Sequence, residues 1–204
     1  MNQHFLQSAA WEKFQQSLGR KVLHNRGDGW EYLAILERGT GNSRLYCPFG
    51  PTATNEKNLQ LALKDLIKLG KKLNVTFLRI GPIKPDFSKV LSYEHWKKAT
   101  YIHLQPEHTH VIDLQQSEEK ILSNMAQPVR SRYRNCHKKG ITIHQSQNPD
   151  DIKYFLELIH EVAKRTGMSP HPDSYFHKQA NSLLPSKDAS FWYATYDNKV
   201  IATA

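Results

Sequence analysis

The sequence is poor in cysteine and has no long hydrophobic run, and each absence excludes a class of protein. Cys47 and Cys136 are the only cysteines and lie far apart, without the Cys-x-x-Cys spacing that is typical of a disulfide framework or a zinc module. We therefore expect a reducing, cytoplasmic setting. Nowhere do about 18 apolar residues occur together, and the N-terminus has no cationic region followed by an apolar run, so we expect neither a membrane span nor a signal peptide.

Acidic residues are scarce as well, and in one stretch they are missing. The chain has 28 Lys and Arg against 19 Asp and Glu, a net charge of +9, which favours polyanionic partners such as RNA, a nucleotide-linked precursor or anionic lipid headgroups. Residues 121–149 contain no acid but five cations, namely Arg130, Arg132, Arg134, Lys138 and Lys139. Three of them, Arg130, Arg134 and Lys138, recur at four-residue intervals and so share one face of a predicted helix. This face either contacts phosphate or is simply solvated, and both alternatives stay open.

An apolar stripe runs beside this basic face and consists of Met125, Val129, Tyr133 and Cys136. On this stripe Cys136 is expected to be a small core residue rather than a nucleophile. The histidines show no His-x-x-x-His or Glu-paired pattern on one helix, so no metal site is expected.

The first half of the chain alternates strand and helix patterns. Ser8 can cap a helix that Gly19 ends. Strands are predicted over residues 21–24, 30–36 and 44–47, with turns at 27–29 and 39–42. A helix with apolar residues between Leu59 and Leu73 then precedes a strand at 75–80, which gives a strand-helix-strand order. A shorter element at 87–96 and an extended stretch at 101–104 follow.

After Pro106 the pattern begins again. It predicts a strand at 109–114, a helix opened by Ser117, a second helix from Pro128 to Lys139 ended by Gly140, and a strand at 141–144. Two more helices follow, one capped by Asp150 or Asp151 and ended by Gly167 and one carrying Tyr175, and then a hairpin of strands 190–196 and 199–203. This predicts a mixed α/β fold in two modules, 1–106 and 107–204. The second sheet stops with an unpaired edge at Ala204, so we expect the N-terminal part of a longer protein.

Several short motifs resemble the Fem family (FemABX-type) when they are taken in order. They are Phe5-Leu6-Gln7-Ser8 with Trp11, Pro48-Phe49-Gly50-Pro51, Leu78-Arg79-Ile80-Gly81-Pro82, Thr109-His110-Val111-Ile112-Asp113-Leu114, the basic run from Arg130 to Gly140, and Ser169-Pro170-His171-Pro172 before Tyr175. Each motif alone is weak. Their order and spacing over essentially the whole chain make the resemblance specific.

The resemblance implies two GNAT-like (acyl-CoA N-acyltransferase-like) modules, the second of them incomplete, with a precursor in a cleft between them. The implied activity is that of a cytoplasmic aminoacyltransferase of cell wall biogenesis. It moves an amino acid from aminoacyl-tRNA, the co-substrate, to a stem-peptide amine of a UDP- or lipid-linked muropeptide, with no metal and no other cofactor. The ester is already activated, so positioning and oxyanion stabilisation suffice and no nucleophile is required. The catalytic residues are expected beyond Ala204, and a peripheral contact with the inner face of the membrane is implied for a lipid-linked substrate.

The resemblance also implies site residues. Lys13 resembles a lysine that meets the precursor's diphosphate, and Tyr175 resembles a tyrosine that lines the same pocket. His171 stands where relatives can have an arginine, and a neutral imidazole holds an anion more weakly. Gly81 stands where an acidic residue often follows the Leu-Arg strand, and Thr76, within the predicted strand 75–80, is the remaining expected substrate-binding residue. The ordinary alternatives are an exposed lysine on an amphipathic helix and a turn histidine without a role.

Two other functions remain as alternatives. The fold alone allows an acyl-CoA-dependent N-acyltransferase of small amines, but fold analogy is a weak reason. The sequence also has no loop suited to the pyrophosphate of coenzyme A. Residues 48–51 include two prolines, which lack N–H donors, and the glycines at 39 and 41 join two strands, whereas a phosphate-binding loop leads into a helix. The second alternative is a non-catalytic RNA-binding module, which the net charge favours.

Overall fold

A computed structural model of the chain describes residues 4–81, 88–93, 96–97, 99 and 110–204. The chain divides into two compact units, unit 1 (Met1–Gln105) and unit 2 (Pro106–Ala204). None of the helices formed by the described residues has the length and hydropathy required to traverse a lipid bilayer.

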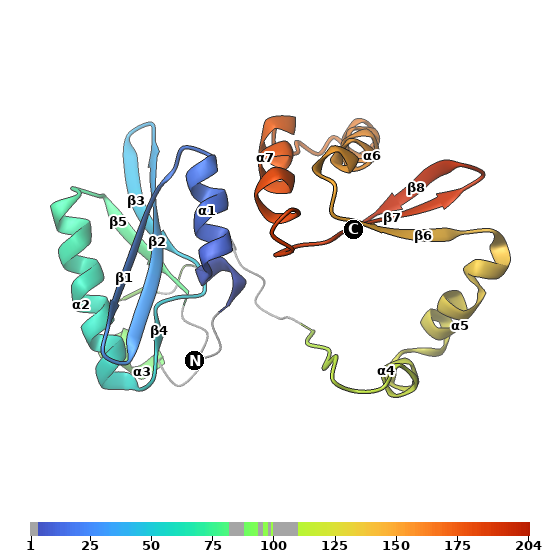
Figure 1. The fold of residues 1–204 in the computed structure, drawn as a ribbon. Helices are drawn as coiled ribbons and strands as arrows, with labels where there is room; N and C mark the ends of the chain where they lie inside the picture. The colour runs from blue at the N-terminus through green and yellow to red at the C-terminus, as the bar shows by residue number, and fades with distance from the viewer. Residues whose placement is uncertain (1–3, 82–87, 94–95, 98, 100–109) are drawn as a thin grey trace. The chain divides into compact units, whose positions relative to one another are not determined.

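Unit 1 is built on a mixed sheet with the strand order β1-β2-β3-β5, in which β4 pairs with β2 (Figure 1). The strands are β1 (Lys21–Gly27), β2 (Trp30–Gly39), β3 (Asn42–Cys47), β4 (Thr52–Ala53) and β5 (Phe77–Ile80). The first three are antiparallel, whereas β3 and β5 are parallel and are connected through helix α2 (Glu56–Lys72). The predicted strand-helix-strand order is therefore confirmed, while β4 was not predicted.

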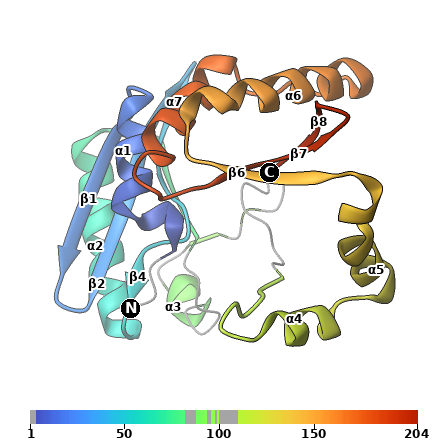
Figure 2. The same cartoon turned by 45° about the vertical axis from the view of Figure 1, so that its right-hand side comes forward.

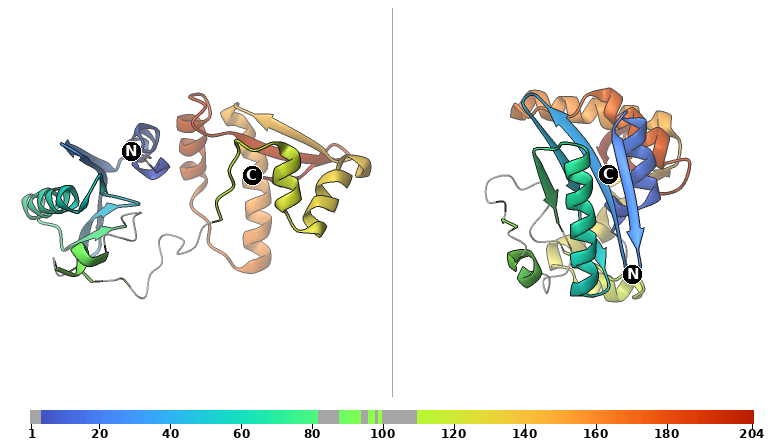
Figure 3. Two further views of the ribbon diagram at one scale, coloured as in Figure 1. Left: turned by 90° about the horizontal axis from the view of Figure 1, so that it is seen from below. Right: turned by 90° about the vertical axis from the view of Figure 1, so that its left-hand side faces the viewer.

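Two helices cover opposite faces of this sheet, α1 (Ala9–Ser17) and α2 (Figure 1 and Figure 3, right). Tyr32 and Ala34 of β2 pack with α2, where they join Leu66 in one cluster of buried residues. The alternate residues Leu33 and Ile35 are buried as well and point to the other face, because successive side chains of a strand alternate. The helix predicted after Ser8 is confirmed: the Ser8 hydroxyl caps it by accepting from the Trp11 N–H.

The motif residue Gln7 lies where β2 changes partners. β2 pairs with β4 at Trp30 and Glu31 and with β3 only from Ile35 onward, which leaves Leu33 between the two ladders. The Gln7 side chain fills this gap: it donates to the carbonyls of Leu33 (3.1 Å) and Pro48 (2.6 Å) and accepts from the Leu33 N–H (2.8 Å). The side chain thus supplies the hydrogen bonds that a neighbouring strand would otherwise provide.

Unit 2 contains a three-stranded antiparallel sheet in the order β6-β7-β8, with α6 (Ile152–Thr166) and α7 (Asp173–Leu183) on one face (Figure 2). The strands are β6 (Thr142–Ser146), β7 (Phe191–Tyr196) and β8 (Lys199–Thr203). Phe191 packs against Ala180 and Leu184 in the core. The hairpin turn that joins β7 to β8 places Asp197 and Asn198 at positive φ, 47° and 58°, as a two-residue hairpin turn requires. The predicted hairpin is confirmed.

Helices α4 (Glu118–Asn124) and α5 (Gln127–Asn135) precede this sheet and contain no buried residue. The predicted helix from Pro128 to Lys139 was too long, since α5 ends at Asn135 and a short 3-10 turn, His137–Lys139, follows. The predicted apolar stripe does not pack either. Val129 and Tyr133 are 46% and 50% exposed, and Cys136 is half-buried rather than a core residue.

Three further predictions differ from the structure or lie outside it. Residues 110–114 of the predicted strand 109–114 form no strand, because an alternating pattern becomes a strand only where a neighbouring edge accepts its hydrogen bonds. Neither Asp150 nor Asp151 makes a capping hydrogen bond to α6, which instead follows a 3-10 turn capped by Asn148. Helix α3 (Ser88–Tyr93) falls within the predicted element at 87–96, whereas the stretch 101–104 lies outside the described residues.

Candidate functional site

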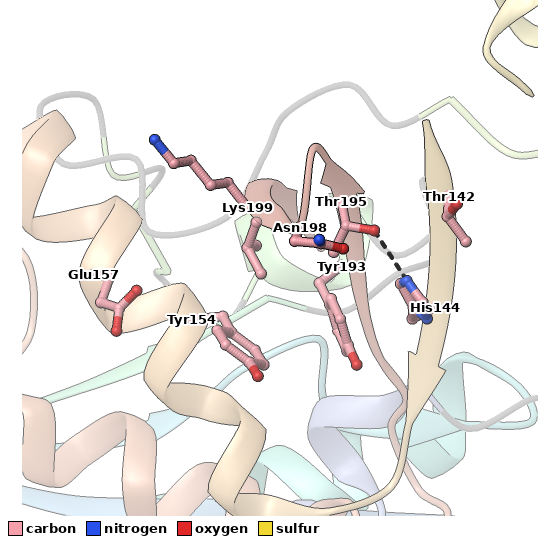
Figure 4. Close-up of a pocket in the computed structure, with 9 residues that line it drawn as sticks. Thr142, His144, Tyr154, Glu157, Tyr193, Thr195, Asn198 and Lys199 are labelled. Atoms are coloured by element: carbon pink, nitrogen blue, oxygen red, sulfur yellow. Dashed lines mark hydrogen bonds between the residues drawn. The ribbon is translucent and has the colours of Figure 1, made fainter. Parts of the chain in front are cut away.

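A groove of about 700 Å³ opens in unit 2 between α6 and the sheet (Figure 4). Helix α6 contributes Tyr154 and Glu157, which lie one turn apart on the same side of the helix. The strands and their hairpin contribute the rest of the lining, namely Thr142, His144, Tyr193, Thr195, Asn198, Lys199 and Val200. The pairing of β6 with β7 sets His144 opposite Tyr193, so residues about 50 positions apart in the chain meet here.

Aromatic rings form one wall of this groove. His144 stacks on Tyr193 with ring centroids 4.8 Å apart and an interplanar angle of 16°. The ring centroid of Tyr154 lies 5.1 Å from that of Tyr193. The Nε2 atom of His144 is 3.1 Å from the Thr195 hydroxyl, which fixes the imidazole (Figure 4). With one carboxylate, one ammonium group and several hydroxyls at its rim, the groove suits a small polar ligand.

The structure brings two of the predicted site residues together in unit 2. His171 stacks on Tyr175 with centroids 4.2 Å apart and an interplanar angle of 20°, because one precedes α7 and the other lies in its first turn. His171 is exposed and Tyr175 is half-buried. The start of α7 is tied to α6 by Asp173, whose Oδ1 lies 2.8 Å from His160 Nε2.

The predicted site residues of unit 1 do not form one group. Lys13 is exposed on α1. The Thr76 hydroxyl accepts from the Ser43 N–H at 3.1 Å, so it ties the start of β5 to β3. Gly81 follows the other end of β5 and donates to the Gly50 carbonyl at 3.0 Å. Thr76 and Gly81 are thus about 16 Å apart along an extended chain. Thr76 bonds to the backbone of β3, and Gly81 bonds to the loop that follows β3.

The basic residues of the predicted phosphate-binding face differ in their surroundings. Arg130 is half-buried and donates to the carbonyls of Ser123 (2.9 Å) and Met125 (2.8 Å). Its guanidinium therefore closes the end of α4, where helix carbonyls lack partners. Arg134 and Lys138 are exposed, but Lys138 lies beyond the end of α5. The expectation of one helical face carrying all three cations was wrong.

A model of the FemAB family matches residues 86–199, which is more than half of the chain. The chain belongs to the FemAB family. The matched residues include the basic run, His171, Tyr175 and almost the entire groove of unit 2, whereas Lys13, Thr76 and Gly81 precede them. No curated protein matches.

Solved structures resemble this FemAB family chain in fold. The crystal structure of FemX superposes with a TM-score of 0.79 at 18% identity, covering 95% of this chain and 53% of FemX. A conserved protein of unknown function from Bacteroides thetaiotaomicron gives a TM-score of 0.52 at 14% identity and covers 94% of this chain and 62% of that protein. The chain therefore spans about half the length of FemX. The likeness concerns the fold, and it confirms the expected α/β, GNAT-like fold class.

Sequence reasoning missed the groove of this FemAB family member. The sequence does show that Tyr154 and Glu157 have a helical spacing of three and that Tyr193 and Thr195 alternate as on one face of a strand. Neither pattern indicates a site by itself, because both are ordinary for elements that pack on a core. Only the strand register places His144 against Tyr193, and no local pattern determines that register.

Proposed function

We propose that this protein transfers an amino acid from aminoacyl-tRNA to a stem-peptide amine of a peptidoglycan precursor. The observation that carries the proposal is the FemAB family match over residues 86–199. Membership of this family supports a transferase that forms peptidoglycan bridges in general. The tRNA as donor and the muropeptide as acceptor are the specific part of the proposal.

In this reaction the main task of the protein is to position the amine and the ester. The neutral amine attacks the ester carbonyl carbon, a C–N bond forms, and the C–O bond to the ribose breaks. The proton of the amine ends on the leaving ribose oxygen, which gives deacylated tRNA and an amide. Holding two reactants in the right geometry supplies roughly 7 to 11 kcal/mol of such a barrier in favourable cases. The reaction therefore needs no cofactor other than the charged tRNA.

Exposed cations support an anionic substrate in each unit. Lys13 in unit 1 and His171 with Tyr175 in unit 2 are proposed to contact the phosphate-bearing precursor, and Arg134 and Lys138 are proposed to contact tRNA phosphates. All of them except the half-buried Tyr175 are exposed, so their polar groups are open to a ligand. Arg130 is proposed to act through structure instead, since its guanidinium binds carbonyls of its own unit.

The decisive experiment is a transfer assay with the purified full-length enzyme. Charged tRNA labelled in the amino acid is mixed with nucleotide-linked or lipid-linked muropeptide, and label that appears in the muropeptide is measured. We expect transfer to at least one of these precursors. Absence of transfer to every precursor, or saturable binding of coenzyme A in calorimetry, contradicts the proposal, and the second result favours an acyl-CoA-dependent enzyme.

Two substitutions test the proposed residue roles. Lys13→Ala is expected to weaken muropeptide binding about ten-fold, as the loss of one charge-assisted contact predicts, while tRNA binding is largely retained. Lys64→Ala on α2 removes an equally exposed lysine and serves as the control. His171→Arg is expected to tighten muropeptide binding, because a guanidinium is always charged and holds phosphate at two points. Unchanged muropeptide affinity in both variants contradicts the assignment.

A further inference from the structure

A second groove, in unit 1, is strongly cationic and belongs to none of the sites described above. It measures about 600 Å³ and is lined by Gly19, Arg20, Lys21, Leu36, Glu37 and Arg38. It lies where the turn after α1 meets the final residues of β2, since Lys21 pairs with Leu36 there (Figure 1). Its lining carries three cations and one carboxylate.

The carboxylate of this groove orients the guanidinium groups around it. Glu37 accepts from Arg44 Nε at 2.5 Å on β3 and lies 4.0 Å from Arg20 Nη1. Arg20 Nη1 also donates to the side-chain oxygen Oε1 of Gln15 at 2.7 Å, and Gln15 is fully buried. Arg20 is therefore held by α1 on one side and by Glu37 on the other, yet 38% of its side chain remains exposed. Glu37 is thus flanked by two guanidinium groups, those of Arg20 and Arg44.

We propose that this groove, defined by Arg20, Lys21 and Arg38, binds the phosphodiester backbone of RNA, in this protein the body of the tRNA co-substrate. The proposal rests on the proposed function. Guanidinium groups in fixed positions suit phosphate oxygens because they donate at two points in one plane. A recess lined by three cations admits a narrow phosphodiester chain, whereas a flat bilayer cannot enter it.

The lining also argues against a lipid surface. Proteins that lie on membranes insert exposed apolar side chains beside their cations. Leu36 is the one apolar side chain in the lining, and it is half-buried. RNA therefore accounts for the groove better than anionic lipid does.

The test measures binding of fluorescently labelled, deacylated tRNA by anisotropy at several salt concentrations. In Arg20→Gln/Arg38→Gln, affinity at about 0.15 M salt is expected to fall roughly ten-fold, and the slope of log affinity against log salt to fall by about 1.4 to 1.8, because each lost phosphate contact contributes about 0.7 to 0.9. The matched control is Lys64→Gln/Lys68→Gln, which removes the same charge from exposed lysines of α2. If the control loses as much tRNA affinity as the double variant, only the net charge of the protein matters, and the proposal is overturned.

A third variant reverses the expected sign. Glu37→Gln removes the only negative charge in the lining, so tRNA is expected to bind at least about two-fold more tightly. A partly unfolded variant does not gain affinity, which separates this result from damage to the fold. Unchanged or weaker binding in Glu37→Gln overturns the proposal.

Two comparisons separate this inference from its competitors. Loss of binding to phosphatidylglycerol vesicles in the double variant, with tRNA affinity unchanged, assigns the groove to lipid and overturns the proposal. In the transfer assay, the double variant is expected to raise KM for tRNA and to keep kcat. If the wild-type protein transfers the amino acid and the variant has an unchanged KM for tRNA, tRNA binding in the groove is refuted while the proposed function stands. If the wild-type protein transfers nothing, the proposed function is refuted, and the anisotropy measurement alone decides whether the groove binds tRNA.

Discussion

Gln7 shows how one side chain can replace a missing piece of sheet. It is 1% exposed, and its amide serves three backbone groups of β2 and of the loop after β3. The glycine of that loop is required by the same side chain, because a Cβ on Gly50 would lie 2.7 Å from the Gln7 amide oxygen. Two of the motifs that resemble the Fem family are therefore explained by packing within unit 1.

Replacing Gln7 with Ala should destabilise unit 1. The substitution leaves three buried backbone groups, the N–H and carbonyl of Leu33 and the carbonyl of Pro48, without this partner. Each such group costs about 1 to 3 kcal/mol, so we expect a loss of about 3 kcal/mol or more. The measurement is urea denaturation. Gln16→Ala is the control, since Gln16 is exposed on the following helix α1, and it should change the free energy of unfolding by less than about 0.5 kcal/mol. Equal effects of the two substitutions contradict this role.

Tyr32 makes unit 1 sensitive to alkaline pH. Burial, reinforced by Asp65, raises the pKa of this phenol above its ordinary value of 10.0. The phenol donates to Asp65 Oδ2 at 2.5 Å, and Asn25 donates to the same oxygen at 2.9 Å. Above pH 10 the unfolded chain releases this proton while the folded protein keeps it, so stability is complete below that pH and is lost as pH rises.

The corresponding prediction compares Tyr32→Phe with the wild-type protein. Between about pH 10 and pH 11, the wild-type free energy of unfolding should fall by about 1 kcal/mol more than that of the variant. Urea denaturation at a series of pH values measures both. Parallel curves for the two proteins contradict the raised pKa.

At the scale of elements, the junction between α4 and α5 depends on Arg130. Neither helix has a buried residue, so packing contributes little and the bonds from Arg130 to the last turn of α4 gain importance. Arg130→Ala should fray α4 and increase amide hydrogen exchange in residues 118–125. Arg134→Ala removes an exposed cation from the same helix and should leave that exchange unchanged.

The same pair of variants separates a structural from a binding role. Arg134→Ala should weaken tRNA binding by a few-fold, as the loss of one phosphate contact predicts. If Arg130→Ala leaves hydrogen exchange in α4 unaltered and Arg134→Ala leaves tRNA affinity unaltered, both assignments are wrong.

For the whole molecule, the main feature is that each unit has its own core. Leu66 packs with buried residues of β2 and β3 in unit 1, and Phe191 packs with α7 residues in unit 2. Leu66→Ala should cost about 2 to 5 kcal/mol and Phe191→Ala about 3 to 5 kcal/mol. Hydrogen exchange resolved by peptide should show each loss in its own unit, with additive effects in the double variant. Loss of protection in both units from one substitution contradicts separate cores.

Local signals predicted much of the fold. Ser8 caps α1 as expected, Gly167 ends α6 with φ of 74°, and β8 has the predicted bounds. These elements depend on neighbours in the chain, so their residues indicate them directly. Predictions failed where the outcome depends on distant partners, as for residues 110–114, which lack the strand expected of their alternating pattern.

The candidate site was predicted only in part. His171 and Tyr175 are four residues apart, and the turn that leads into α7 stacks one ring on the other. The groove of unit 2 and the cationic groove of unit 1 were not predicted, because each combines residues whose proximity follows from strand pairing. The sequence spacing of Arg130 predicted a phosphate contact, but in the structure its guanidinium donates to carbonyls at the end of α4.

The sequence by itself determined the cationic character of the chain, its α/β class and those helix ends that carry a local signal, such as the Ser8 cap of α1 and the Gly167 end of α6, because composition, periodicity and capping are properties of neighbouring residues. Tertiary structure alone decided which side chains meet. Strand register placed His144 on Tyr193 and Lys21 beside Leu36, and a shift of one residue would have turned each of these side chains to the opposite face of its sheet.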